Sequence, residues 1–162
     1  MLSILIFSAA LRQCVVIDSL SSSNVVTFLI NGPTDPPPGD AAGVAAQGVD
    51  FWPLALAREL DDAIMELRLN EQEIGTWVFK SAGDPAMVAA ADQALLDNSN
   101  DWLVRETTLY LRRVLKRVDV SSRSLITLVE PGSCFAGTLV ELMLAADRVY
   151  MLDGTFEGSN EI

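Results

Sequence analysis

Hydrophobic and polar positions follow two different periods along the chain. Residues 13–18 and 24–31 are β-branched runs separated by a serine-rich stretch, which predicts two strands joined as a hairpin. Residues 32–50 carry prolines and glycines that neither a helix nor a strand tolerates for long, so we expect a loop there. From Phe51 the apolar positions recur at helical spacing, which predicts an amphipathic helix with a solvated face. The charged positions on that face are Glu59, Asp61, Asp62, Glu66 and Arg68.

The next elements have recognisable ends. Asp50 is the expected N-cap of the first helix, and Pro53 fits into its first turn. Residues 74–80 predict a buried strand, because the run is short and rich in aromatic and β-branched residues. Asp84 and Asp101 each stand directly before a new helical pattern, so each is expected to open a helix.

The C-terminal third repeats the order of strand, turn and helix. Residues 124–130 predict a strand and residues 131–137 a glycine-rich turn. Residues 138–147 predict a helix with so little polar surface that we expect it to be buried, and residues 148–152 predict a short strand. Strands that alternate with helices imply a parallel sheet, so the fold class is α/β.

Charge and composition exclude several classes of function. The 162 residues contain 22 acidic and 11 basic side chains, giving a net charge of −11, so nucleic acid is not an expected partner. The apolar start of the chain lacks the cations of a signal peptide and is too short to span a bilayer, so no membrane partner is expected. With no histidine and only two cysteines, neither a metal site nor a disulfide framework is expected, which favours the cytoplasm.

A run of cations lies near the end of the helix that Asp101 opens. Near a helix C-terminus cations interact favourably with the macrodipole, so a solvated face is favoured over a phosphate-binding patch. The run consists of Arg112, Arg113, Lys116 and Arg117.

The turn GSCFAGTLVEL, residues 132–142, is the strongest candidate for chemistry. A glycine turn that feeds a helix presents free backbone N–H groups, here those of Gly137 and Thr138, which can hold a negatively charged oxygen. Glu141, partly removed from water by the apolar residues after it, would suit proton transfer. Taken alone, these features are more often structural. Cys134 is likewise more often a buried hydrophobe than a nucleophile, because no cation adjoins it.

The order of these segments resembles the crotonase (enoyl-CoA hydratase/isomerase) superfamily. The resemblance rests on a helix with RELDDAI, a strand ending in FKSAGD and the stretch LITLVEPGSCFAGTLVELMLAADRVYM, and it begins near Val25. It implies a crotonase-like spiral of ββα units. The unusual EPGSC at residues 130–134 is similar to the same segment in the superfamily members of aromatic degradation that open the ring of epoxidised benzoyl-CoA with water. Cys134 would therefore mark that branch of the superfamily.

The resemblance also implies an oxyanion hole for the thioester carbonyl. Its donors would be the N–H groups of Asp84, after Gly83, and of Thr138, after Gly137, and both glycines would contact the substrate. The Asp84 carboxylate would have to turn away from an incoming enolate. CoA would be part of the acyl-CoA substrate, with no separate cofactor, and a homo-oligomer is expected.

Within the same resemblance, two catalytic residues and the extent of the domain are expected. Glu141 would direct water at the substrate, and Cys134 is the second catalytic candidate; a further glutamate would be Glu157 or Glu161. Residues 1–162 would form a partial crotonase-like domain, apparently incomplete at the C-terminus, in which residues 1–23 hold an N-terminal segment and the first strand. The alternatives are an enoyl-CoA hydratase/isomerase, or an inactive truncated domain that only binds CoA thioesters or a partner chain.

Overall fold

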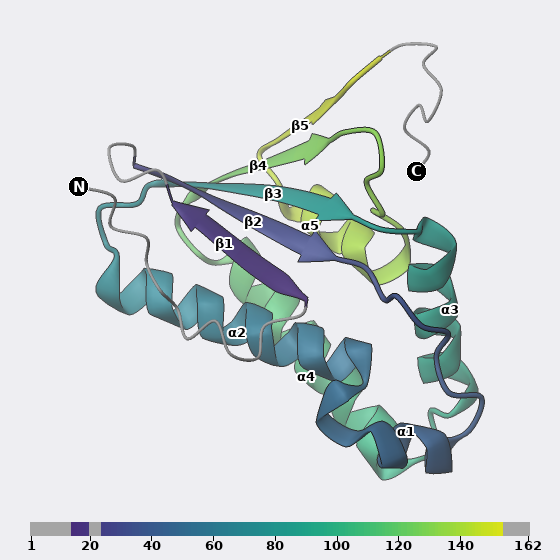
Figure 1. Cartoon of the computed structure of the whole chain (residues 1–162). Helices are drawn as coiled ribbons and strands as arrows, with labels where there is room; N and C mark the ends of the chain where they lie inside the picture. The colour runs from purple at the N-terminus through teal and green to yellow at the C-terminus, as the bar shows by residue number, and fades with distance from the viewer. Residues whose placement is uncertain (1–13, 20–23, 154–162) are drawn as a thin grey trace.

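A computed structural model describes residues 14–19 and 24–153, and these form one five-stranded sheet with helices (Figure 1). The strands are β1 (Val15–Ser19), β2 (Val25–Asn31), β3 (Thr76–Ala82), β4 (Ser124–Val129) and β5 (Arg148–Met151). They lie in the sheet in chain order, with β1 antiparallel to β2 and all later neighbours parallel. The predicted hairpin and the predicted parallel α/β sheet are therefore confirmed.

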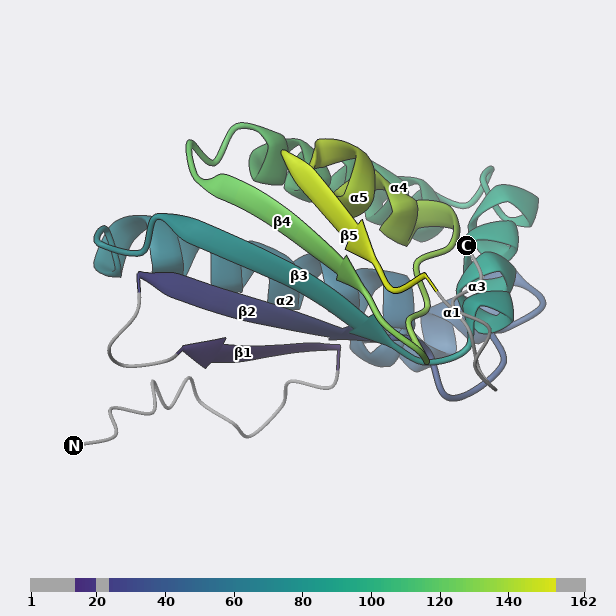
Figure 2. The same ribbon diagram turned by 90° about the horizontal axis from the view of Figure 1, so that it is seen from above.

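The helices gather on one side of this sheet. They are α1 (Ala41–Gln47), α2 (Trp52–Asn70), α3 (Pro85–Asp97), α4 (Trp102–Asp119) and α5 (Val140–Ala145), with 3-10 turns η1 (Gly48–Asp50) and η2 (Gly137–Leu139). Figures 1 and 2 show α2 and α4 under the sheet and α3 beyond the ends of its parallel strands, while no described helix covers the opposite face. Within the described residues, no helix combines the length and apolar character needed to cross a bilayer.

The core lies between the sheet and its helices. Side chains of β2 and β3 alternate between buried and half-buried positions, as a sheet covered on one face requires. The Phe28 ring lies 4.9 Å from that of Phe79 and 5.3 Å from that of Trp77, all three fully buried. Burying a side chain of this size contributes about 1.5–3 kcal/mol, so this aromatic cluster fixes β2 against β3.

Three predictions about local structure are wrong. The segment 32–50 is not all loop, because Asp40 accepts a hydrogen bond from the Gly43 N–H at 2.8 Å and caps the alanine-rich helix α1. Asp50 belongs to η1, so Phe51 and not Asp50 is the N-cap of α2, although Pro53 does fit into its first turn. The predicted buried helix at 138–147 splits into η2 and the short α5, on which Leu144 is 74% exposed.

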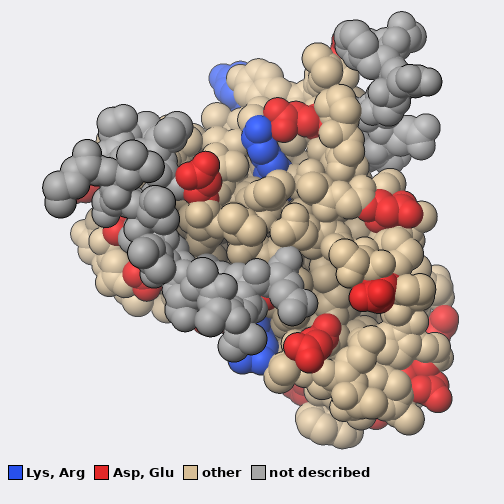
Figure 3. Space-filling model, viewed as in Figure 1, with Lys and Arg blue, Asp and Glu red and all other residues tan. Residues whose placement is uncertain are grey.

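The acidic face of α2 is also not simply solvated. The Glu59 carboxylate accepts hydrogen bonds from the N–H groups of Cys14 and Val15, at 2.9 and 2.8 Å, and so holds the start of β1. Asp61 binds the Tyr110 hydroxyl and the Arg117 guanidinium, which joins α2 to α4. On the face that Figure 3 shows, acidic side chains are scattered with few cations among them, in keeping with the net charge of −11.

Candidate functional site

Three loops meet at the carboxyl ends of β2, β3 and β4. The Gly32 N–H donates to the Ala82 carbonyl at 2.8 Å, and the Gly83 N–H donates to the Gly132 carbonyl at 3.1 Å. A Cβ at Gly32 would lie 3.1 Å from the Cys134 sulfur, and one at Gly83 would lie 3.5 Å from it. The loops therefore pack backbone against backbone around the sulfur, which leaves no room for side chains at either glycine.

Cys134 is part of this packing. Its side chain has no exposed surface, its N–H donates to the Ser81 hydroxyl at 2.9 Å, and burial raises the pKa of its thiol. A nucleophilic cysteine instead needs a lowered pKa and access to its substrate. These features agree with the expected buried hydrophobe and give no support to the catalytic prediction for Cys134.

The turn after β3 presents the first predicted donor. Gly83 has a φ of 144°, and Asp84 directly after it caps α3, its carboxylate accepting from the Ala86 N–H at 2.8 Å. The carboxylate is thus turned to its own helix, as the oxyanion prediction requires. Within the described residues the Asp84 N–H has no hydrogen-bond acceptor.

The turn after β4 is arranged differently, because Asp92 reaches it from the middle of α3. The Asp92 carboxylate accepts from both the N–H and the hydroxyl of Thr138, each at 2.6 Å. Gly137 has a φ of 47°, and a Cβ there would collide with the same carboxylate. The second predicted donor therefore already has a charged acceptor. Only a weak signal pointed to this contact, a single acid at residue 92 among the alanines of a predicted helix.

The two predicted donors do not face one cavity. Gly83 and Asp84 line a hollow of about 840 Å³ beside α2 and the segment after β2. Gly137, Thr138 and Glu141 line another, of about 560 Å³. The structure therefore brings together the candidates of the second turn and leaves Asp84 apart from them.

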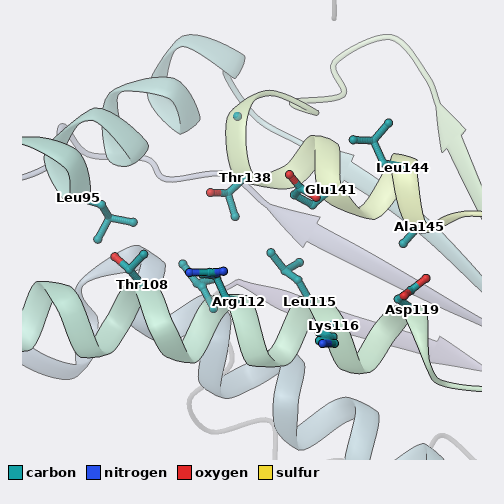
Figure 4. Close-up of a pocket in the computed structure, with 12 residues that line it drawn as sticks. Leu95, Thr108, Arg112, Leu115, Lys116, Asp119, Thr138, Glu141, Leu144 and Ala145 are labelled. Atoms are coloured by element: carbon teal, nitrogen blue, oxygen red, sulfur yellow. The ribbon is translucent and has the colours of Figure 1, made fainter. Parts of the chain in front are cut away.

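The 560 Å³ cavity lies between α3, α4 and the η2–α5 segment (Figure 4). Its residues are Leu95, Thr108, Leu111, Arg112, Leu115, Lys116, Asp119, Gly137, Thr138, Glu141, Leu144 and Ala145. Glu141 is exposed, so it is not removed from water by its apolar neighbours as predicted. Arg112 and Lys116 are exposed, as predicted for a solvated face, and they also line this cavity.

Comparison with known proteins gives a consistent assignment of the fold. No family model matches the chain. An enoyl-CoA hydratase/isomerase from Marinobacter aquaeolei superposes with a TM-score of 0.56 at 16% identity, over 83% of this chain and 47% of that one. The chain carries a crotonase fold. AtuE of Pseudomonas aeruginosa (TM-score 0.54, 16% identity) and an enoyl-CoA hydratase from Bacillus anthracis (0.54, 21%) share this crotonase fold. They match over 85% and 84% of this chain, and over 47% and 46% of their own.

A curated relative adds a likeness in sequence to this crotonase fold. The chain is 50% identical over 133 residues to a benzoyl-CoA-dihydrodiol lyase of Aromatoleum evansii, which covers 82% of this chain and 24% of the relative. The chain thus spans less than half of the solved structures and about a quarter of the lyase. The expected crotonase-like fold is confirmed. The residues 1–13, Glu157 and Glu161 lie outside the described residues.

Proposed function

We propose that the chain provides part of a CoA-thioester enzyme of aromatic degradation that opens the ring of epoxidised benzoyl-CoA with water. One observation carries this proposal, the 50% identity over 133 residues to a protein named benzoyl-CoA-dihydrodiol lyase. By the same resemblance we expect a homo-oligomer that acts in the cytoplasm, with CoA as part of its acyl-CoA substrate.

The 560 Å³ cavity supports a chemical role for the second turn. In the proposed mechanism the Thr138 N–H holds the thioester carbonyl oxygen and Glu141, which lines the same cavity, takes a proton from water. In this first step the water oxygen bonds to one carbon of a ring C=C bond conjugated with the thioester, the π bond breaks, and its electron pair moves onto the thioester to give an enolate while Glu141 holds the water proton. Each such N–H donor typically stabilises the charged oxygen by about 3 kcal/mol. The mechanism requires Asp92 to release the Thr138 N–H, since its carboxylate holds that donor at 2.6 Å.

Two other functions follow from specific observations. Fold neighbours named enoyl-CoA hydratase/isomerase favour addition of water to an enoyl-CoA. The Asp92 carboxylate on the Thr138 N–H instead favours a domain that binds CoA thioesters without turning them over.

The experiment combines calorimetric titration with an activity assay. We expect the 162-residue chain to bind benzoyl-CoA and to consume epoxidised benzoyl-CoA faster than crotonyl-CoA. Glu141→Gln should abolish turnover and leave binding of benzoyl-CoA within about two-fold, since the amide keeps the size of the side chain but cannot accept a proton.

The matched control is Glu73→Gln. Glu73 is exposed and lies before β3, at the opposite end of the strand from the turns, so this variant should keep full turnover. Preference for crotonyl-CoA would identify the hydratase alternative, and binding without turnover would identify the binding domain. If neither thioester binds, the proposal fails.

A further inference from the structure

Two cations of α4 face the cavity that holds Glu141. Thr108, Arg112 and Lys116 follow at intervals of four residues, so they lie along one face of the helix. We call Arg112 and Lys116 the cationic pair. Figure 4 shows this pair on α4, across the cavity from Glu141 on α5.

The cationic pair has no partner in the described part of the chain. The ion pairs there join Lys80 to Glu130, Arg105 to Glu106 and Arg117 to Asp61. Neither Arg112 nor Lys116 takes part in a hydrogen bond or an ion pair among these residues. Their N–H donors are therefore available to a ligand in the cavity.

Half of the remaining residues of the cavity wall are apolar, and the other half are Thr108, Asp119, Gly137, Thr138 and Glu141. Its hydrophobic residues are Leu95, Leu111, Leu115, Leu144 and Ala145. Such a wall receives a ring or a hydrocarbon chain, while a few placed polar groups fix its orientation. N–H donors beside such a wall favour a ligand with matching oxygen atoms, because these oxygens gain charge-assisted hydrogen bonds that a plain hydrocarbon cannot make.

We propose that Arg112 and Lys116 determine acyl-group specificity by donating hydrogen bonds to oxygen atoms carried on the ring or chain of the acyl group. This inference rests on the proposed function and names the part of the substrate that the cavity selects. Thr138 lines the same cavity, and the acyl group begins at the carbonyl that its N–H would hold. The phosphates of CoA lie at the far end of the pantetheine arm from that carbonyl. Oxygen atoms of the acyl group are therefore the better match for the N–H donors of the cationic pair.

The test measures dissociation constants for three stable probes, 3-hydroxybenzoyl-CoA, benzoyl-CoA and free CoA. Arg112→Met and Lys116→Met remove each charge and keep the length of the side chain. We expect each variant to raise the dissociation constant of 3-hydroxybenzoyl-CoA by about ten-fold, the effect of one lost charge-assisted hydrogen bond. The dissociation constants of the other two probes should change by less than about three-fold. Arg112→Lys should recover most of the loss.

The matched control is Arg105→Met, an exposed cation of α4 that does not line the cavity and carries the same change in net charge. It should leave all three constants unchanged, and thermal melts should show every variant folded, because all three side chains are exposed. Equal losses for free CoA would mean that the pair holds phosphates, and unchanged constants would mean that it holds nothing; either result overturns the inference alone. A wild-type chain that binds no acyl-CoA overturns the proposed function as well.

Discussion

The turns after β3 and β4 differ in what their carboxylates do. After β3, Asp84 uses its carboxylate on its own helix and its N–H stays without an acceptor in the described residues. After β4, the Thr138 N–H is held by Asp92, which lies 46 positions earlier in the chain. A backbone donor is therefore available or occupied according to where the nearest acid lies in space, and a glycine motif alone does not reveal which.

Alanine at the two glycines should give the largest effect. Gly83→Ala meets the backbone of Gly32 at 3.2 Å in a strained conformation, so we expect a loss of about 2–4 kcal/mol in the free energy of unfolding. Gly137→Ala meets only the side chain of Asp92, which can move, and should cost about 1–3 kcal/mol. Urea unfolding measures both.

Repeating both glycine substitutions in the Asp92→Ala variant sharpens this test. Without the carboxylate, Gly137→Ala should cost only its left-handed strain, about 1 kcal/mol, while the cost of Gly83→Ala should stay the same. If Gly137→Ala lowers the free energy of unfolding equally with and without the Asp92 carboxylate, then this carboxylate does not contact the added methyl group.

Alanine at Asp92 or Asp84 should lower the free energy of unfolding by less than alanine at Gly83. Asp92→Ala takes away a charged acceptor from two donors of Thr138, so we expect it to cost about 1.5–3 kcal/mol in the free energy of unfolding. Asp84→Ala removes a helix cap and should cost about 1 kcal/mol.

The same two variants separate the turns in binding. Asp92→Ala frees the Thr138 N–H and should lower the dissociation constant of benzoyl-CoA. Asp84→Ala should leave this constant unchanged. Weaker binding by Asp92→Ala would mean that the carboxylate orders the turn for the ligand and does not compete with it.

Ionisation of the thiol between the turns should leave stability unchanged near neutral pH and affect it only at high pH. Burial raises the pKa of Cys134, and that of Cys14 to about 12 from an ordinary value of 9.0. Above about pH 9 the unfolded chain loses these protons and the folded chain keeps them, so stability falls as pH rises. For Cys14 the fall is up to about 1.4 kcal/mol per pH unit until its pKa of about 12, and for Cys134 it has the same direction.

Cys134→Ala should therefore make the decline between pH 8 and 10.5 shallower, and Cys14→Ala should do the same independently. Urea unfolding at several pH values gives the slopes, which are compared with the wild-type slope because lysines and tyrosines also titrate there. An unchanged slope in Cys134→Ala would show that water reaches the sulfur between the turns.

The order of the elements could be predicted because its signals are local. The alternating β-branched runs and the Asp-Pro start of α3 each act within a few residues, and the structure confirms the strands and the Asp84 cap. Long-range contacts could not be predicted in the same way. The Glu59 carboxylate accepts from N–H groups at the start of β1, and the Asp92 carboxylate accepts from the Thr138 N–H. Both contacts join residues far apart in the chain, and no spacing rule encodes them.

The two faces of α4 have an evolutionary consequence. The residues that pack against the core, among them Val104, Leu111 and Val118, form one stripe, and Thr108, Arg112 and Lys116 form another. Substitutions in the second stripe leave the packed stripe untouched, so related chains can exchange these three side chains with little loss of stability. Under the proposed role of the cationic pair, divergence of substrate choice within this fold should therefore concentrate at positions 108, 112 and 116 while the buried stripe changes slowly.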